Sequence, residues 1–152
     1  MRSVFILLLG TILLLGCSPE ISKEDAAPVG DWRHHGGNHR SEKYSPLDQV
    51  NGSNFGLLEV AWRYRSPDLE LPEELAYPTG DYRAMPLVIN GVMYVNSNHG
   101  VISALDPVTG EEHWVFDPKS YEYGPPLFSP LQTRGIEYWT DGNIERLFIA
   151  TS

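Results

Sequence analysis

Hydrophobic and polar residues alternate most regularly between residues 86 and 117 of this sequence. The dipeptide Asn90-Gly91 separates two short apolar runs. It is the strongest short-range signal for a β-hairpin, because both turn positions need a positive φ. Turn-forming residues also occupy 96–100 and 106–110. The pattern predicts an antiparallel meander of four short strands, over 87–89, 92–95, 101–105 and 113–116.

A second, partial copy of this pattern follows the first. Residues 135–139 and 146–150 are predicted as its first two strands. Upstream, the alternation of polar and apolar residues in 59–65 predicts a half-buried strand. The stretch before it is polar and turn-rich, with a possible strand only near Tyr44. Three prolines indicate that 66–81 is a long loop.

Together these elements predict an all-β fold. A four-stranded sheet of about thirty residues cannot bury both faces alone, so it needs neighbouring sheets stacked on it, as in a β-propeller blade. Closing a propeller takes at least about four blades of roughly 40–45 residues each. Residues 17–152 are too few for this. We therefore expect the N-terminal part of a longer propeller, with about one full blade and part of a second.

The first residues have the pattern of an export signal. The apolar run 4–15 would span roughly 18 Å as a helix, short of the ~30 Å of a bilayer core, and is interpreted as a secretory leader. It ends at Gly16-Cys17, which resembles the bacterial lipoprotein signal; the alternative is an ordinary leader with a stray cysteine. The lipoprotein resemblance implies lipidation of Cys17 and lasting attachment to the periplasmic face of a bacterial membrane. The expected division of the chain is a signal peptide over 1–16, a polar tether over 17–30 and an incomplete propeller domain over 31–152.

Composition adds exclusions to this picture. The 152 residues carry a formal net charge of −9, which argues against a polyanion such as nucleic acid as a partner. The single cysteine excludes an internal disulfide and a cysteine-built zinc site. A histidine cluster suggests a metal site but lacks helical spacing, so a surface loop is the favoured interpretation; it comprises His34, His35 and His39. The acidic stretch 68–74 is interpreted as a solvated loop.

One stretch of the meander combines a turn with residues suited to the stacking of sheets. It matches A-x-D-x-x-T-G-x-x-x-W at every fixed position, which are Ala104, Asp106, Thr109, Gly110 and Trp114. The small alanine permits close sheet packing, and the aspartate can cap the turn that Thr-Gly completes. The tryptophan offers a broad apolar surface to the next blade. The motif resembles the tryptophan-docking repeat of pyrroloquinoline-quinone (PQQ) enzymes, although non-catalytic propellers use it too.

Three further segments resemble the PQQ-dependent (quinoprotein) dehydrogenases of the glucose and alcohol type. Residues 31–62 resemble their N-terminal signature W…GG…YSPL…N…N…L…AW, 85–94 resemble T-P-L-V-x-x-G-x-M-Y, and 134–139 resemble R-G-x-x-Y-W. The resemblance implies an eight-bladed propeller with PQQ in its central funnel beside a calcium ion. It also implies that 59–65 is an outer strand of the closing blade.

Within this resemblance, two arginines are candidate cofactor-binding residues. Arg134 matches the family arginine near the PQQ ring carbonyls, where a guanidinium stabilises developing negative charge; the alternative is a surface arginine. Arg83 stands where several relatives carry glutamate or glutamine, so it either pairs with a PQQ carboxylate or points to solvent. The adjacent cysteines of the alcohol branch are missing from 128–133, which favours a glucose-dehydrogenase-like branch. The calcium ligands and the catalytic aspartate are expected after Ser152.

Two functions are compatible with these patterns. The first is PQQ-dependent oxidation of a sugar or alcohol in the periplasm, with electrons passed to membrane quinone or a cytochrome; this stretch alone is expected to be inactive. The second is a non-enzymatic propeller lipoprotein that serves as an outer-membrane assembly scaffold. A scaffold should lack the YSPL and R-G-x-x-Y-W segments, and both are present, so the enzyme is favoured.

Overall fold

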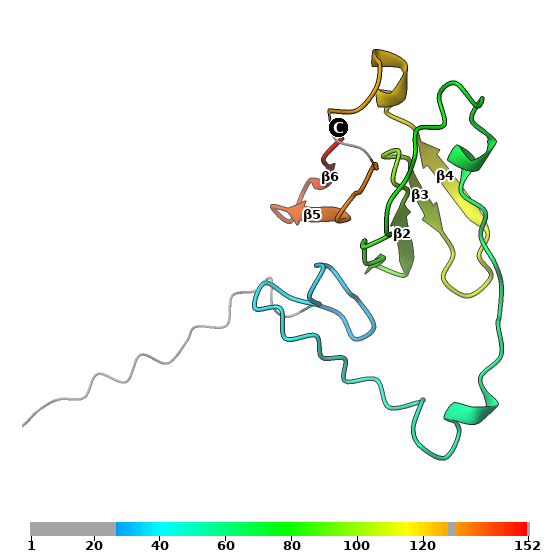
Figure 1. The fold of residues 1–152 in the computed structure, drawn as a ribbon. Helices are drawn as coiled ribbons and strands as arrows, with labels where there is room; N and C mark the ends of the chain where they lie inside the picture. Colours follow the sequence, from blue (N-terminus) through cyan, green and yellow to red (C-terminus); the bar gives the residue numbers. More distant parts are fainter. Residues whose placement is uncertain (1–26, 128–129, 152) are drawn as a thin grey trace, which may run out of the picture.

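The computed structural model describes residues 27–127 and 130–151. The predicted signal peptide, Cys17 and most of the tether lie outside these residues. The described chain contains six strands and short 3₁₀ helices but no α-helix (Figure 1). The all-β class is therefore confirmed. The strands are β1 (Leu87–Ile89), β2 (Val92–Asn96), β3 (Ile102–Leu105), β4 (Glu112–Phe116), β5 (Ile136–Thr140) and β6 (Glu145–Ile149). The 3₁₀ helices are η2 (Phe55–Leu57), η3 (Pro67–Glu70) and η4 (Ser120–Tyr123).

The predicted meander is confirmed as a four-stranded antiparallel sheet in the order β1-β2-β3-β4. Its first hairpin pairs Ile89 with Val92 and leaves a two-residue turn. Asn90 and Gly91 both have positive φ, 51° and 80°, as the primed turns of tight hairpins require. The register of β3 and β4 shifts after Ala104, beside the turn of the predicted docking motif.

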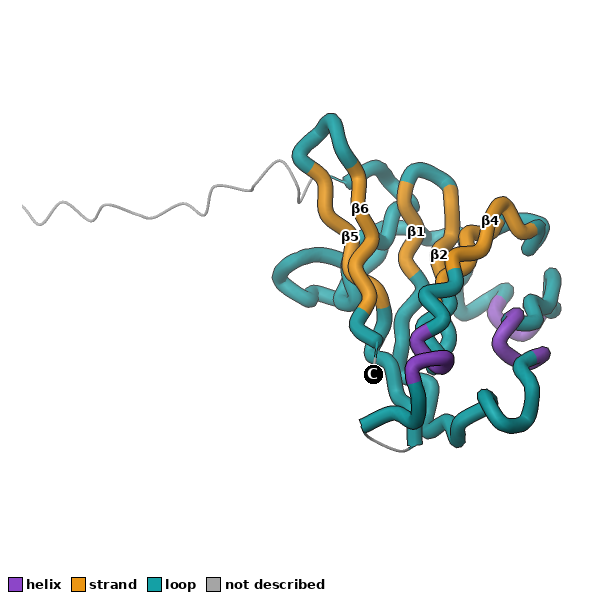
Figure 2. The backbone as a smooth tube through the Cα atoms, turned by 90° about the horizontal axis from the view of Figure 1, so that it is seen from above, coloured by secondary structure: helices purple, strands orange, loops and turns teal. Residues whose placement is uncertain are grey.

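The predicted second copy is confirmed as a two-stranded sheet of β5 and β6. The β5–β6 hairpin lies beside the β1–β2 hairpin, with the two turns at the same end (Figure 2). As a result, the residues that precede β1 and those that precede β5 share the opposite end. That end is where the two candidate arginines of the sequence analysis are found.

The hydrophobic core lies between the two sheets. Its buried members come from β1, β3 and β5 and are Leu87, Ile89, Ile102, Ile136 and Tyr138. Fully burying side chains of this size contributes about 1.5–3 kcal/mol each. The first sheet thus buries one face against a neighbouring sheet, as predicted for a sheet that cannot bury both faces alone. The number of blades in the family propeller stays a prediction.

An N-terminal strap, residues 31–37, adds to the free edge of β1. Trp32 pairs with Val88 through two backbone hydrogen bonds of 2.7 and 3.0 Å. The tryptophan ring also packs against the core between the sheets. The possible strand near Tyr44 is wrong, because no strand is present between residues 38 and 58. Those residues form turns and the short helix η2 instead.

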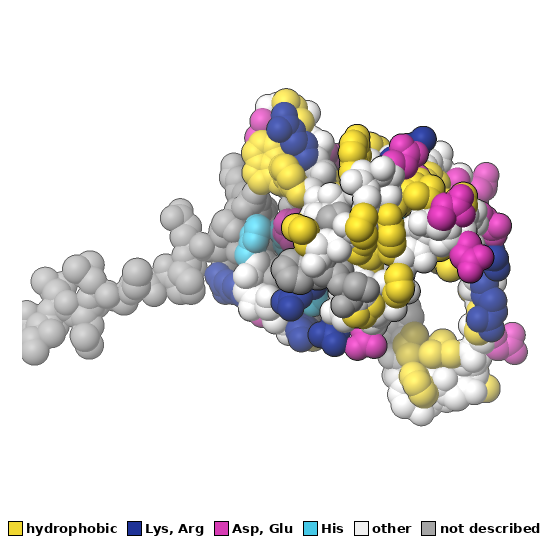
Figure 3. All heavy atoms as spheres, turned by 45° about the horizontal axis from the view of Figure 1, so that its top comes forward, with side chains coloured by type: hydrophobic (Ala, Val, Ile, Leu, Met, Phe, Trp, Pro, Cys, Tyr) yellow, Lys and Arg dark blue, Asp and Glu magenta, His cyan; other side chains and the backbone are white. Residues whose placement is uncertain are grey.

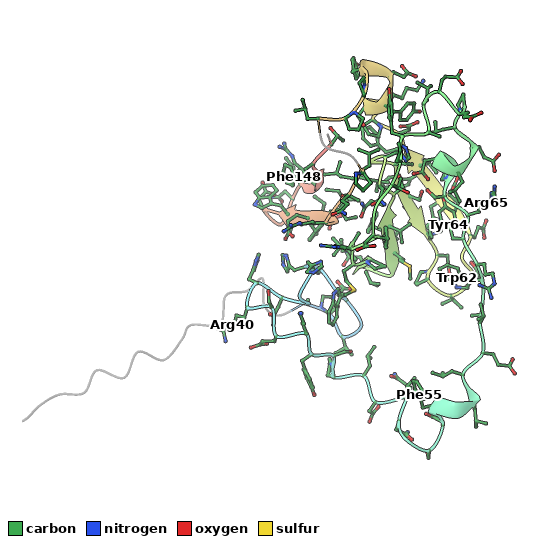
Figure 4. The ribbon with its side chains drawn as sticks, in the orientation of Figure 1. Arg40, Phe55, Trp62, Tyr64, Arg65 and Phe148 are labelled. Carbon is green, nitrogen blue, oxygen red and sulfur yellow. The ribbon has the colours of Figure 1, made fainter. Side chains whose placement is uncertain are left out.

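The strand predicted over 59–65 does not form within the described residues. Its backbone makes no hydrogen bond to another described residue, so no ladder forms. The alternation has a different cause: Trp62 and Tyr64 are half-buried while their neighbours are exposed. Both side chains reach the four-stranded sheet from a segment that runs alongside it (Figure 4). Pairing of this segment with a closing blade remains a prediction.

Several large apolar side chains between residues 44 and 60 are exposed. They include Tyr44, Phe55, Leu57, Leu58 and Val60, each more than half exposed. This segment extends away from the sheets (Figure 1), and hydrophobic side chains cover part of the protruding surface (Figure 3). None of the helices in the described residues has the length and apolar character needed to cross a bilayer.

Candidate functional site

The two arginine-bearing segments run side by side. Thr79 and Leu131 form a parallel bridge. The Gly80 N–H donates to the Leu131 carbonyl at 2.8 Å, and the Leu131 N–H donates to the Pro78 carbonyl at 2.8 Å. Further along, a Cβ atom placed on Gly135 would lie 3.7 Å from the Cβ of Ala84. Parallel pairing therefore carries both segments towards the starts of β1 and β5 together.

Arg83 and Arg134 occupy this shared end, and both side chains are exposed. Arg83 Nη2 donates to Asp81 Oδ2 at 3.0 Å, a solvent-exposed ion pair of little energetic weight. Arg134 makes no hydrogen bond or ion pair to another described residue. The structure thus brings together the segments of the two predicted cofactor residues. Both guanidinium groups remain accessible to an anionic ligand.

The side chain of Asn98 connects the two arginine-bearing segments by hydrogen bonds. Its Nδ2 donates to the Gly80 carbonyl at 3.2 Å, and its Oδ1 accepts from the Thr133 N–H at 3.3 Å. The neighbouring Asn96 Nδ2 donates to Thr133 Oγ1 at 3.2 Å. The sequence pattern predicts only a turn over 96–100. The signal that could have identified them is the pair of amide side chains, Asn96 and Asn98, at the end of β2.

A buried histidine–carboxylate pair lies next to this turn. His99 Nδ1 and Asp68 Oδ2 are 3.1 Å apart, and the two side chains are 6% and 8% exposed. Burial raises the pKa of Asp68, but hydrogen bonds from Ser66, Ser97 and His99 outweigh burial and hold that pKa below its ordinary value. The interpretation of 68–74 as a solvated loop is therefore wrong for Asp68. The backbone turn of η3 directs this carboxylate inward, which composition could not reveal.

A cavity of about 580 Å³ separates the 62–82 segment from the four-stranded sheet. Its walls include four aromatic side chains, from Trp62, Tyr64, Tyr77 and Tyr82. Asn98 and His99 line it on the side of the arginine-bearing segments. The buried Nε2 of His99 has no hydrogen-bond partner among the described residues. The volume lies in the range of small-molecule sites.

The docking motif forms a tightly capped turn. Asp106 Oδ1 accepts from the Val108 and Thr109 N–H groups at 2.7 and 2.8 Å, as its position predicted. These backbone hydrogen bonds, first from Thr109 and then from Val108, lower the pKa of Asp106. Ala104 is fully buried, consistent with close sheet packing. The motif's Trp114 is 43% exposed, with its ring 5.8 Å from that of Tyr94.

Trp62 packs on the same turn, a contact that the sequence analysis missed. Its Nε1 donates to the Pro107 carbonyl at 3.1 Å. Gly110 has a φ of 74°, and a Cβ atom there would lie 2.6 Å from Cδ2 of the Trp62 indole. The Ala-Trp pair at 61–62 is part of the segment that resembles the family signature. That resemblance does not indicate that Trp62 packs on the docking turn.

No group of three or more potential metal-ligating side chains occurs within residues 27–127 and 130–151. In the histidine cluster, the rings of His34 and His39 lie 3.9 Å apart. His34 Nδ1 lies 2.5 Å from Glu137 Oε1 of β5. His35 is exposed. The contact between His34 and Glu137 attaches the strap to the second sheet.

Comparison with known proteins gives a consistent result. A family model described as "PQQ: Glucose/ethanol/alcohol dehydrogenase, beta-propeller domain" matches residues 32–152. An alcohol dehydrogenase (quinone), dehydrogenase subunit, of Gluconobacter oxydans (strain 621H) is 38% identical over 98 residues, 64% of this chain and 12% of the relative. Quinoprotein glucose dehydrogenase A of Acinetobacter calcoaceticus is 34% identical over 129 residues, 83% of this chain and 16% of the relative.

Solved structures of similar proteins agree with this match. Quinohemoprotein alcohol dehydrogenase from Comamonas testosteroni superposes with a TM-score of 0.50 at 34% identity, over 64% of this chain and 13% of that chain. The corresponding enzyme from Pseudomonas putida HK5 gives a TM-score of 0.54 at 32% identity, over 66% and 14%. The aligned part of this chain covers between 11% and 17% of the length of these curated relatives.

Proposed function

Because this chain belongs to the PQQ-dependent glucose/ethanol/alcohol dehydrogenase β-propeller family, we propose that it forms part of an enzyme that oxidises a sugar or an alcohol at its hydroxyl-bearing carbon. The observation that carries the proposal is the family match over 32–152. The paired segments 78–84 and 130–135 support it, since they place two accessible arginines at one end of the sheets. The family assignment favours the enzyme over the scaffold alternative.

The two arginines suit an anionic quinone. Arg134 has no ion-pair partner among the described residues, and Arg83 has only an exposed carboxylate neighbour. A guanidinium offers planar, paired donors to carboxylate or carbonyl oxygens. We assign Arg134 to the PQQ ring oxygens, where it would stabilise negative charge as the quinone is reduced, and Arg83 to a PQQ carboxylate. PQQ, when bound, supplies the two-electron acceptor.

Asn98 would hold these arginines in register. Its side-chain amide contacts both arginine-bearing segments, at Gly80 and Thr133. A side chain locked by two hydrogen bonds keeps the supporting backbone of a binding site from drifting. The calcium ion and catalytic aspartate implied by the family resemblance are not assigned to any described residue.

Location and electron transfer are further parts of the proposal. Lipidation at Cys17 would attach the protein to the periplasmic face of a bacterial membrane. Membrane quinone or a cytochrome would then accept the electrons. Support comes from relatives whose names specify a quinone, or cytochrome c in the case of the 1-butanol dehydrogenase of Thauera butanivorans. Mass spectrometry of the mature N-terminus would identify the acyl groups on Cys17, and an unmodified thiol there would refute the anchor.

The catalytic proposal is tested in membranes of the source bacterium. Deleting the gene should abolish dye reduction that depends on added PQQ and on glucose, ethanol or butanol, and restoring the locus should recover it. When the locus is restored with Arg134→Ala, the PQQ concentration needed for half-maximal rate should rise tenfold or more. When it is restored with Arg63→Ala, a substitution at an exposed residue, that concentration should stay unchanged. Unchanged dye reduction after deletion would refute the proposal.

A further inference from the structure

Asn90 connects three parts of the molecule through its backbone and side chain. Its backbone N–H donates to Asp31 Oδ1 at 3.1 Å. Its Oδ1 accepts from Arg33 Nη2 at 3.3 Å, and its Nδ2 donates to Glu145 Oε1 at 3.1 Å. The strap is therefore tied to the β1–β2 turn and, through the same asparagine, to the first residue of β6. We call this set of contacts the Asn90 clasp.

The residue that follows Asn90 is a glycine in open space. Nothing lies within 4 Å of the position that a Cβ atom of Gly91 would occupy. Its backbone N–H makes no hydrogen bond to another described residue. An unhindered backbone nitrogen after asparagine is the nucleophile that attacks the asparagine side-chain carbonyl in deamidation, one source of the thermal lability of asparagine.

The clasp places charged groups on both ends of the amide under attack. Arg33 donates to the carbonyl oxygen, where negative charge builds up in the tetrahedral intermediate, and a positioned cationic donor stabilises such charge. The Nε of Arg33 donates to Asp31 Oδ2 at 2.8 Å. The other N–H groups of the guanidinium are available to Asn90. Glu145 accepts from the amide nitrogen that leaves. The Arg33 contact makes Cγ more electrophilic, and the Glu145 contact fixes the orientation of the amide.

We propose that Asn90 is a site of spontaneous deamidation in the folded protein and that Arg33 promotes the reaction. The Gly91 nitrogen loses its proton to solvent and bonds to Cγ of Asn90. The Cγ–Nδ2 bond then breaks, and ammonia leaves with protons taken from water. Water opens the resulting succinimide to aspartate or isoaspartate. The net change is amide plus water to carboxylate plus ammonium, without oxidation or reduction.

The product cannot keep the clasp. A carboxylate has no proton to donate to Glu145, and two carboxylates at about 3 Å repel each other. Isoaspartate also lengthens the backbone inside a two-residue turn whose φ values are both positive, so the hairpin geometry changes. Deamidation would thus break the link between the β1–β2 turn and Glu145 of β6, while the contact with Arg33 is retained or strengthened. The strap keeps its own contact with the second hairpin through His34 and Glu137.

A second Asn-Gly pair provides a matched internal control. Asn51, followed by Gly52, is exposed, and nothing lies within 4 Å of the Cβ position of Gly52. Its Oδ1 accepts only neutral donors, the Ser53 N–H at 3.0 Å and the Ser53 hydroxyl at 2.6 Å. The two sites share their dipeptide and their open glycine. They differ in the cationic donor and in backbone conformation, since Asn90 and Gly91 have positive φ and Asn51 and Gly52 do not, so the Arg33→Gln variant isolates the effect of the donor.

The test is a time course of the full chain at pH 8 and 37 °C, followed by peptide mass spectrometry of both sites. In the folded chain, Asn90 should convert at least about threefold faster than Asn51, because of the cationic donor. In urea the two rates should be equal. Arg33→Gln should slow Asn90 to the rate of Asn51 without changing Asn51.

Three outcomes would overturn the proposal. They are an Asn90 rate in the folded chain equal to or below that of Asn51, a rate ratio that persists in urea, and an Arg33→Gln variant with an unchanged ratio. The comparison of folded and urea-unfolded chain needs no substitution, so it decides the matter even where Arg33→Gln fails to fold. Mass and charge of the product distinguish deamidation from backbone cleavage.

Discussion

The indole of Trp62 lies directly against Gly110, the glycine of the docking turn. A Cβ atom on Gly110 would be 2.6 Å from the indole Cδ2, and the indole Nε1 donates to the Pro107 carbonyl at 3.1 Å. Trp62 is thus held on a turn some forty-five residues away by close packing and by one hydrogen bond. This contact explains why a chain segment without backbone pairing still follows the sheet.

Gly110→Ala should destabilise the fold, for two separable reasons. The residue has a φ of 74°, which costs a non-glycine residue about 1 kcal/mol, and the new methyl group would collide with Trp62. Gly142→Ala is the control, since Gly142 has a φ of 92° with nothing within 4 Å. Urea unfolding should show a loss for Gly110→Ala that exceeds that of the control by about 1–3 kcal/mol. Equal losses would mean that the Trp62 contact does not constrain this position.

The Asp68–His99 pair predicts an acid-sensitive contribution to stability. The pKa of Asp68 is lowered in the folded protein, so its stabilisation is present above the ordinary carboxyl pKa and is lost as pH falls through the lowered value. Asp68→Asn should reduce the free energy of unfolding at pH 7 by about 1–3 kcal/mol. Thermal melts across pH 2–7 should show the two proteins converging at low pH. Glu70→Gln, at an exposed neighbour, should run parallel to the unmodified chain.

Tyr121 should titrate at unusually high pH. Its hydroxyl donates to Asp117 Oδ2 at 2.5 Å, and this hydrogen bond to a carboxylate, followed by burial, raises the pKa of Tyr121 to about 12. A raised pKa means that the stabilisation is complete below pH 10 and disappears as pH rises towards 12. Absorbance at 295 nm should therefore lose one late-titrating tyrosine in Tyr121→Phe. In Asp117→Asn that tyrosine should titrate earlier, and an unchanged titration curve would contradict the assignment.

The Asn90 clasp should contribute measurably to stability. Arg33→Ala removes the ion pair with Asp31, the contact with Asn90 and a cation–π contact 5.6 Å from the centre of the Tyr138 ring. We expect a loss of about 1–3 kcal/mol in the free energy of unfolding, since the partner carboxylate is largely buried. Arg40→Ala, at an exposed residue of the same region (Figure 4), should change it by less than about 0.5 kcal/mol. Similar losses in both variants would indicate a general charge effect.

Asn98→Ala tests whether PQQ binding depends on the positions of the two arginine-bearing segments as well as on the arginines themselves. It removes the two hydrogen bonds that join the backbone at Gly80 to that at Thr133. In the complete enzyme the PQQ concentration for half-maximal rate should rise severalfold while both arginines remain present. Asn143→Ala, at an exposed turn residue, provides the comparison. A variant with normal PQQ dependence would show that Asn98 does not position the arginine-bearing segments.

The strands were predictable because their information is local. Asn90-Gly91 demands a tight hairpin, and the regular spacing of turn residues sets the lengths of β1 to β4. Segment 59–65 shows where this reasoning stops. Alternation reports that one face is buried, but it does not report whether the backbone finds a ladder partner. Within the described residues the buried face meets the sheet through side chains only, and the backbone has no ladder partner there.

For the site, the sequence by itself determined the capped turn at Asp106, and it predicts Arg83 and Arg134 as cofactor-binding residues. Only the tertiary structure decided which segments lie together. The parallel pairing of Thr79 with Leu131, the inward carboxylate of Asp68 and the seat of Trp62 on Gly110 each join residues more than thirty positions apart. Such contacts depend on how loops cross the sheet edges, and hydrophobic periodicity carries no information about that path.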